Sequence, residues 1–368
     1  MSRISMAIPV FNGNEKKYLD ECIDTGWVSA NGRFVNEFEA KFAEYCGVKY
    51  AISCANGTVS LHLALMALDI GPGDEVIMPT LTYIATANCV KYCGATPVFV
   101  DSDPDTFNIS AEDIEKKITP RTKAIIPVHL YGLCSDMDAI NAIAKKHGLY
   151  VIEDAAEAHG AMIGNRKSGT MSDIGSFSFF GNKIITSGEG GMVVTNNEEL
   201  YKKMKLIKGQ GMSPEKRYWH VIVGYNYRMT NMQAAVGLAQ LENIEWHIAQ
   251  RKRVAEEYKK HFGGYELVRM QDCPEGYTHV YWMNNVILSD KVKLSRDEVM
   301  KRMEQHDIEM RPVFYPMHVM PPYYDADASF PVAEKLADRG ISLPSHAMLT
   351  NEDIAFISNT LKAIIEGE

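Results

Sequence analysis

The alternation of short apolar runs with helical stretches constrains the fold of this chain more than any other feature. Over the first two thirds, apolar runs recur at 51–54, 75–78, 97–100, 124–128 and 150–152, and helical patterns at 59–68, 111–118 and 137–147 separate them. Strands that alternate with helices of about ten residues need crossover connections between them. The pattern therefore predicts an α/β fold with a mostly parallel central sheet flanked by helices, whose ligands bind beyond the carboxyl ends of the strands.

A different pattern begins after Arg228. We expect one long helix over 230–262, ended by Gly263 and Gly264, then strands at 280–288 and 309–314 and a last helix at 353–365. Ser295 and Glu298 have the spacing of a capping box and predict another helix over 295–306. These elements predict a smaller C-terminal α+β domain over 246–368, which the long helix joins to a large domain over 1–245.

Charge and cysteine content exclude several classes of protein. The 368 residues include 38 Lys and Arg against 47 Asp and Glu, a net charge of −9, which argues against nucleic acid as a partner. The apolar stretches fall short of the roughly 20 residues that a membrane-spanning helix needs. The seven cysteines are scattered without the spacing of a zinc site. We therefore expect reduced cysteines in a cytoplasmic protein, without a metal site or a membrane segment.

Two motifs lie where a strand ends. Asn56, Gly57 and Thr58 follow the run at 51–54 and precede a helix, so their N–H groups are placed to bind a phosphate. The alternative is a turn and helix cap with no ligand. Glu153 and Asp154 end a second buried strand, where a carboxylate can pair with a protonated ring nitrogen and keep a pyridine cationic. Here the alternative is a cap for the following helix.

Lys183 lies between the aromatic stretch 176–180 and the glycine-rich stretch 188–191. A lysine in a restricted pocket can lower its pKa and form a Schiff base, and glycines let the backbone pass close to a ligand. The stretch lacks the strand–GxGxxG–helix context of a dinucleotide site. The alternative interpretation is a solvated charge. A further mixture of basic and aromatic residues at 216–228 suits a diphosphate and a stacked base, or an exposed loop with anchoring aromatics.

Taken in order, the motifs NGT (56–58), EDAAEAHGA (153–161), SFSFFGNKIITSGEGGMV (176–193) and YNYRMTNMQAAVGLAQLE (225–242) resemble the DegT/DnrJ/EryC1/StrS family of sugar aminotransferases. These are fold-type-I enzymes that use pyridoxal 5′-phosphate (PLP). The resemblance extends from 26–39 to 339–345. It implies that Lys183 is the catalytic lysine bonded to PLP and that Asp154 pairs with the ring nitrogen. The PLP contacts that it implies are Gly57, Thr58, Tyr83, Asp154, Glu157, Ser178, Lys183 and, from the neighbouring subunit of a homodimer, Asn226.

Within the family, KRYWH (216–220), RPVFYPMH (311–318) and RGISLPS (339–345) look most like members that transfer an amino group from L-glutamate to GDP-4-keto-6-deoxymannose. The resemblance implies a role in making a surface glycan such as the O-antigen of lipopolysaccharide. Arg228 is a candidate for the glutamate carboxylate, since arginine binds carboxylates bidentately, or it anchors the loop before the long helix. His318 is expected to reach the hexose, and its alternative is a structural histidine beside Pro321 and Pro322. The full set of expected substrate contacts is Trp27, Ser29, Asn31, Lys216, Arg217, Tyr218, Trp219, Arg228, Tyr315 and His318.

Lys183 also bears on the type of reaction. A related 3-dehydratase with the same fold has histidine in place of this lysine, so the resemblance favours transamination over dehydration. Two alternatives stay open. One is an aminotransferase of the same family that acts on a UDP- or dTDP-linked keto sugar. The other is a sensor that binds PLP or a sugar without turnover.

Overall fold

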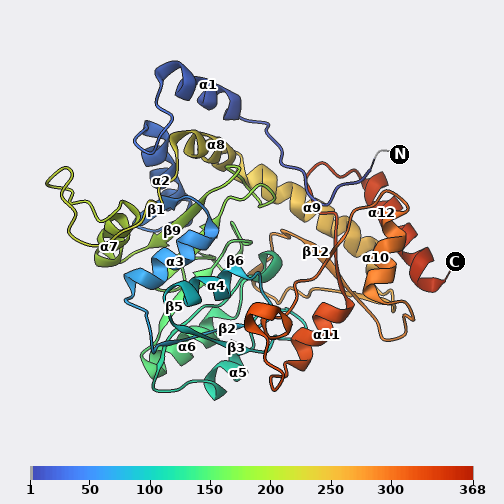
Figure 1. Ribbon diagram of the computed structural model, residues 1–368. Helices are drawn as coiled ribbons and strands as arrows, with labels where there is room; N and C mark the ends of the chain where they lie inside the picture. Colours follow the sequence, from blue (N-terminus) through green and yellow to red (C-terminus); the bar gives the residue numbers. More distant parts are fainter. Residues whose placement is uncertain (1–2, 368) are drawn as a thin grey trace.

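The computed structural model describes residues 3–367, and in this range the large sheet has seven strands in the order β1-β9-β8-β5-β4-β2-β3 (Figure 1). Only β9 runs against its neighbours, so the sheet is mostly parallel. The strands are β1 (Tyr50–Cys54), β2 (Glu75–Pro79), β3 (Thr96–Val100), β4 (Thr122–Ile125), β5 (Tyr150–Asp154), β8 (Ile174–Ser178) and β9 (Gly191–Thr195). The predicted α/β fold is confirmed.

Helices cover both faces of this sheet because its strands are apolar on both sides. Successive residues of β2 show the division: Val76 packs into one buried cluster and Ile77 into the other. The first face is covered by α3 (Gly57–Ala67), α4 (Ala85–Tyr92) and α7 (Glu198–Lys208). The second is covered by α2 (Arg33–Cys46), α5 (Ala111–Lys116), α6 (Met137–His147) and α8 (Asn231–Glu242), while α1 (Glu15–Thr25) packs on α8.

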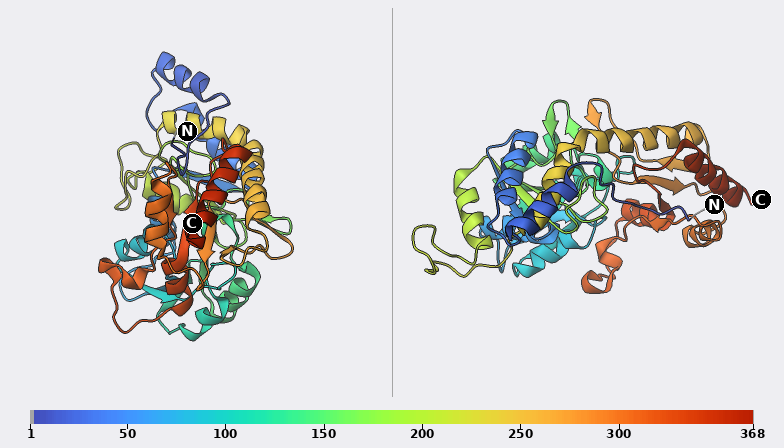
Figure 2. Two further views of the ribbon diagram at one scale, coloured as in Figure 1. Left: turned by 90° about the vertical axis from the view of Figure 1, so that its right-hand side faces the viewer. Right: turned by 90° about the horizontal axis from the view of Figure 1, so that it is seen from above.

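The C-terminal part is built on an antiparallel sheet in the order β10-β12-β14-β13. Its strands are β10 (Val268–Met270), β12 (Asn284–Leu288), β13 (Arg311–Pro312) and β14 (Gly340–Leu343). The helices around it are α9 (Ile244–Phe262), α10 (Arg296–Glu304), α11 (Pro331–Arg339) and α12 (Asn351–Glu366). A small third sheet joins β6 (Met162–Ile163), β7 (Arg166–Lys167) and β11 (Tyr277–Thr278). Figure 2 shows the large sheet and the C-terminal part at opposite ends of the molecule.

The helix expected over 230–262 is wrong as one element. It is two helices, α8 and α9, because Asn243 leaves the helical conformation at φ −111° and ψ 14°. Asparagine is a weak helix former whose amide competes for nearby backbone groups. The end of α9 at Gly263 is confirmed, and Gly264 has a positive φ of 74°. The capping box of Ser295 and Glu298 is confirmed at the start of α10.

One finding bears on the predicted division of the chain at residue 245. Ile4 packs into the C-terminal buried cluster, and its backbone bonds to Asp307 and Glu309, so the N-terminal segment lies against the C-terminal part. The division itself stays a prediction. No helix between residues 3 and 367 combines the length and apolar character needed to cross a bilayer. In the same range, no three His, Cys, Asp or Glu side chains gather as metal ligands would.

Candidate active site

A cavity of about 450 Å³ lies where the parallel strands end, between the large sheet and the C-terminal part. Asp154 ends β5, Ser178 ends β8 and Gly57 begins α3, so the crossover topology brings these distant residues to one edge. Seven residues expected to contact PLP line this cavity: Gly57, Thr58, Tyr83, Asp154, Glu157, Ser178 and Lys183. The fold therefore gathers seven of the eight residues that were expected to contact PLP, all but Asn226, at one cavity.

Lys183 is largely buried, and its surroundings shift the pKa of its amine in opposite directions. Its Nζ lies 3.8 Å from Glu157 Oε1 and 3.8 Å from the centre of the Trp282 ring, and its side chain is only 11% exposed. Burial lowers the pKa of Lys183, while the nearby carboxyls of Glu157 and Asp154 act in the opposite direction. A buried lysine whose pKa is lowered is suited to exchange a proton.

Asp154 is buried and held at two oxygens. Thr86 Oγ1 donates to Oδ2 at 2.9 Å, and the Ala156 N–H donates to Oδ1 at 3.2 Å. Burial raises the pKa of Asp154, and these two hydrogen bonds and the Lys183 charge oppose the rise. Glu157 lies nearby, with the Tyr131 N–H donating to its Oε2 at 2.7 Å, and burial raises its pKa to about 7. Burial thus shifts the carboxyls of Asp154 and Glu157 and the amine of Lys183 toward their neutral forms.

The start of α3 offers unpaired donors. Asn56 Oδ1 accepts the Val59 N–H at 3.0 Å, which confirms the helix start. The N–H groups of Gly57 and Thr58 have no acceptor within residues 3–367. A Cβ on Gly57 would come within 2.7 Å of Ser178 Cβ, so only glycine lets the helix start approach the Ser178 hydroxyl this closely. Phosphate donors, an acid at a strand end and an enclosed amine together match the chemical groups of PLP.

The other predicted residues lie outside this cavity. Asn226 pairs with Gly209 through the backbone, and its Oδ1 accepts from Arg228 Nε at 2.9 Å. The segment 210–223, which we call the arm, projects beyond α7 (Figures 1 and 2) and carries Tyr218, 75% exposed. The residues that the chain does not bring to its own cavity are Trp27, Ser29, Asn31, Lys216, Arg217, Tyr218, Trp219, Asn226, Arg228, Tyr315 and His318.

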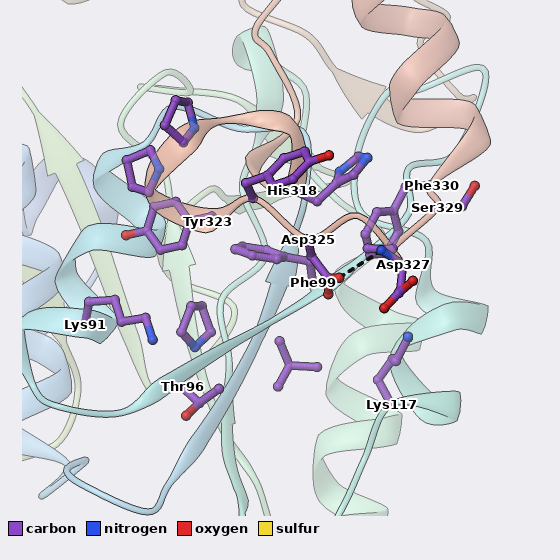
Figure 3. Close-up of a pocket in the computed structure, with 16 residues that line it drawn as sticks. Lys91, Thr96, Phe99, Lys117, His318, Tyr323, Asp325, Asp327, Ser329 and Phe330 are labelled. Atoms are coloured by element: carbon purple, nitrogen blue, oxygen red, sulfur yellow. Dashed lines mark hydrogen bonds between the residues drawn. The ribbon is translucent and has the colours of Figure 1, made fainter.

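His318 borders a different hollow, an open one of about 830 Å³ beside β3 (Figure 3). Its Nδ1 lies 3.0 Å from Thr80 Oγ1 and its Nε2 lies 3.1 Å from Glu334 Oε1. Both ring nitrogens are therefore paired within the chain, and His318 links the end of β2 to α11. The expected contact between His318 and the hexose stays a prediction.

Sequence reasoning missed the partners that hold the predicted residues. Thr86 positions Asp154, Tyr131 positions Glu157, and Trp282 lies against Lys183. Arg311 and Phe314 also line the cavity, from the C-terminal part. The resemblance did quote the RPVFYPMH stretch that contains both. The TLTYIAT stretch (80–86) that contains Tyr83 also ends at Thr86, but no role was expected for Thr86, and no motif contained Tyr131 or Trp282.

Comparison with known proteins shows the family of aminotransferases to which the chain belongs. The model of the DegT/DnrJ/EryC1/StrS aminotransferase family matches residues 10–362, and the chain belongs to this family. It is 54% identical to the GDP-perosamine synthase of Caulobacter vibrioides over 99% of each chain. It is 43% identical to a UDP-N-acetyl-3-dehydro-α-D-glucosamine 3-aminotransferase of Acidithiobacillus ferrooxidans, over 89% of this chain and 88% of the relative.

Solved structures agree with the fold. The crystal structure of DesV from S. venezuelae superposes with a TM-score of 0.91 at 33% sequence identity, covering 96% of this chain and 95% of DesV. The PseC aminotransferase of Helicobacter pylori, involved in the biosynthesis of pseudoaminic acid, covers 100% of both chains with a TM-score of 0.94 at 27% identity. The architecture described above is therefore that of the family's aminotransferases.

Proposed function

We propose that this chain is a PLP-dependent aminotransferase that converts GDP-4-keto-6-deoxymannose and L-glutamate into GDP-perosamine and 2-oxoglutarate. The observation that carries the proposal is the enclosure of Lys183 and Asp154 in one cavity at the carboxyl edge of the sheet. The choice of sugar nucleotide is supported by the end-to-end similarity to the C. vibrioides GDP-perosamine synthase.

We expect different residues of the cavity to bind each end of PLP. The N–H groups at the start of α3 and the Ser178 hydroxyl would hold the phosphate, and Tyr83 would stack on the ring. Asp154 would face the ring nitrogen and keep it protonated. PLP, when bound, accepts the electron pair left when an amino donor loses its α-proton.

The protein's own part in the reaction is proton transfer. Lys183 Nζ takes the α-proton of L-glutamate in the first half of the reaction and delivers a proton at C4 of the sugar in the second. Burial lowers the pKa of Lys183, so its neutral form is available to act as a base near neutral pH. Thr86 fixes the Asp154 carboxyl with the hydrogen bond described above. Glu157, 3.8 Å from Nζ, offsets the positive charge that Lys183 gains.

The arm provides the basis for a shared active site. Lys216, Arg217, Tyr218 and Trp219 do not line the cavity of their own chain, and Val223 at the end of the arm is 92% exposed. We infer that the arm and Asn226 reach the cavity of a second copy, where they bind the GDP diphosphate and base and the PLP phosphate. A homodimer would then be the smallest active unit. The cytoplasmic location and the role in O-antigen biosynthesis stay predictions.

A second candidate is amination of a UDP-linked 3-keto sugar, which the A. ferrooxidans relative favours. The Lys183–Asp154 arrangement serves either substrate, since it acts on the amino donor and not on the nucleotide. The Lys183–Asp154 pair argues against a sensor without turnover, and turnover with L-glutamate would eliminate that alternative.

Mass spectrometry of one reaction tests the proposal. The holoenzyme is mixed with nitrogen-15-labelled L-glutamate and GDP-4-keto-6-deoxymannose, with K183A as the control. We expect a nitrogen-labelled GDP-sugar from the wild type and none from K183A. If the wild type forms 2-oxoglutarate but leaves the GDP-sugar unlabelled, the choice of sugar is wrong, and UDP- and dTDP-linked keto sugars are tested next. If no 2-oxoglutarate forms, L-glutamate is not the donor.

A further inference from the structure

Trp282 is the closest aromatic neighbour of the Lys183 amine. Nζ lies 3.8 Å from the centre of the Trp282 ring, a distance typical of a cation–π contact. The indole Nε1 donates to the backbone oxygen of Asn182 at 2.8 Å, and the tryptophan is 5% exposed. Trp282 therefore touches both the amine of Lys183 and the loop that carries it.

Two further contacts fix the position of Trp282. Arg251 Nη1, on α9, donates to the Trp282 carbonyl at 2.9 Å. The ring of Tyr131 lies nearly parallel to the indole at 6.2 Å, and the Tyr131 N–H holds Glu157. Tyr131 thus contacts both neighbours of Nζ, the indole through its ring and the Glu157 carboxyl through its N–H. Arg251 and Trp282 belong to the C-terminal part and Lys183 to the large sheet region, so the contact spans the two.

Burial and the Trp282 ring favour opposite protonation states of Lys183. Burial favours the neutral amine, whereas the negative face of an indole favours an ammonium. Lys183 also faces the carboxyls of Asp154 and Glu157 and the imidazole of His159. The remaining titratable side chains that line the spaces around Lys183 are Tyr83, Tyr131, Glu189, His247, Arg251 and Arg311. Among these residues and Trp282, the Trp282 ring is the aromatic face that lies against Nζ, and it can be replaced without altering a charge.

We propose that Trp282 is a positioning residue that stabilises Lys183 in its protonated form while the lysine carries the proton between amino donor and sugar. The inference rests on the proposed function for its purpose, but the contact itself can be tested without substrates or cofactor. It identifies a residue of the C-terminal part as a determinant of the basicity of the lysine.

The test is the pH dependence of Lys183 labelling in the apoenzyme. Acetic anhydride reacts with the neutral amine, and peptide mass spectrometry reports the extent of modification at Lys183 alone. We expect W282L to move the labelling midpoint to lower pH and to raise labelling below the midpoint about tenfold. W282F keeps an aromatic face but loses the bond to Asn182, so its midpoint should lie near that of the wild type. W246L, which changes a tryptophan on α9, is the matched control and should leave the Lys183 midpoint unchanged.

Three results would overturn the inference. One is a W282L midpoint equal to that of the wild type. Another is a W282F midpoint that moves as far as that of W282L, because the lost Nε1–H bond and not the ring face would then be responsible. The third is a midpoint that moves equally in W246L. If W282L does not fold, as judged by circular dichroism, W282M replaces it, because the longer and more flexible methionine side chain can adapt to the space of the indole. Failure to aminate a GDP-sugar would refute the proposed function and leave this result unaffected.

Discussion

Replacing Thr86 by valine tests how the site keeps Asp154 ionised. The threonine hydroxyl donates to Asp154 Oδ2 at 2.9 Å, and the Ala156 N–H is the other donor to this carboxyl. T86V preserves the shape of the side chain and removes one of these two bonds. Burial already raises the pKa of Asp154, so loss of a bond that favours the carboxylate raises it further.

The size of the expected pKa change follows from the charge of the accepting Asp154 carboxylate. A hydrogen bond to a charged group contributes about 1.5–3 kcal/mol, and one pKa unit corresponds to about 1.4 kcal/mol. The pKa of Asp154 in T86V should therefore rise by about 1–2. The carboxylate form would then be lost at a higher pH as the solution is acidified. The acidic limb of the activity profile should move to higher pH by the same amount, with little change at alkaline pH.

The assay is the pH dependence of kcat with L-glutamate and the keto sugar. T86S keeps the hydroxyl and should retain the wild-type profile. T82V gives a graded comparison: the Thr82 hydroxyl is hydrogen-bonded to that of Thr86 at 3.2 Å and has no bond to Asp154, so T82V should move the acidic limb less than T86V. If the T86V profile coincides with that of T86S, the hydrogen bond does not set the ionisation of Asp154 and the reasoning is wrong.

Three further predictions concern the same cavity. In the apoenzyme, the pKa of Glu157 is raised to about 7, so the free energy of unfolding should fall as pH rises from about 4.5 to 7, and E157Q should flatten this slope in denaturant titrations. G57A should weaken PLP binding by tenfold or more without unfolding the chain, measured by absorbance titration, because the added Cβ would press against Ser178. Mixing inactive K183A and N226A subunits should restore activity if the site is shared, and no recovery after verified subunit exchange would contradict the dimer model.

The regular elements were predictable from the chain because their signals are local. The expected helix over 137–147 matches α6, which has an Asp136 cap at its start and Gly148 in the left-handed conformation at its end. The prediction of one long helix was wrong at Asn243, because the helical sequence pattern continues on both sides of this residue and does not show the break. The packing of Ile4 against the C-terminal part was equally invisible, because it depends on a pairing with residues about 300 positions away.

The residues of the site also differ in whether a local sequence signal marks them. Gly57, Asp154 and Lys183 could be found because each follows a strand or opens a helix, and parallel strands present such residues at one edge. His318 was assigned to the sugar from its motif, and the structure shows both of its nitrogens engaged elsewhere. Trp282 carries no motif at all. Its importance appears only when the C-terminal part is placed against the large sheet.

The balance of charges in the cavity explains why these supporting residues matter. Burial shifts Lys183 and the two acids toward their neutral forms, which works against a lysine that must gain and lose a proton in each cycle. Opposing groups must therefore keep both forms accessible: Thr86 favours the Asp154 carboxylate, and the Trp282 face favours the ammonium. Neither group carries a charge, so each adjusts one ionisation without adding a further titratable group to a crowded site. Neither residue is charged, which is why a search for charged motifs finds neither Thr86 nor Trp282.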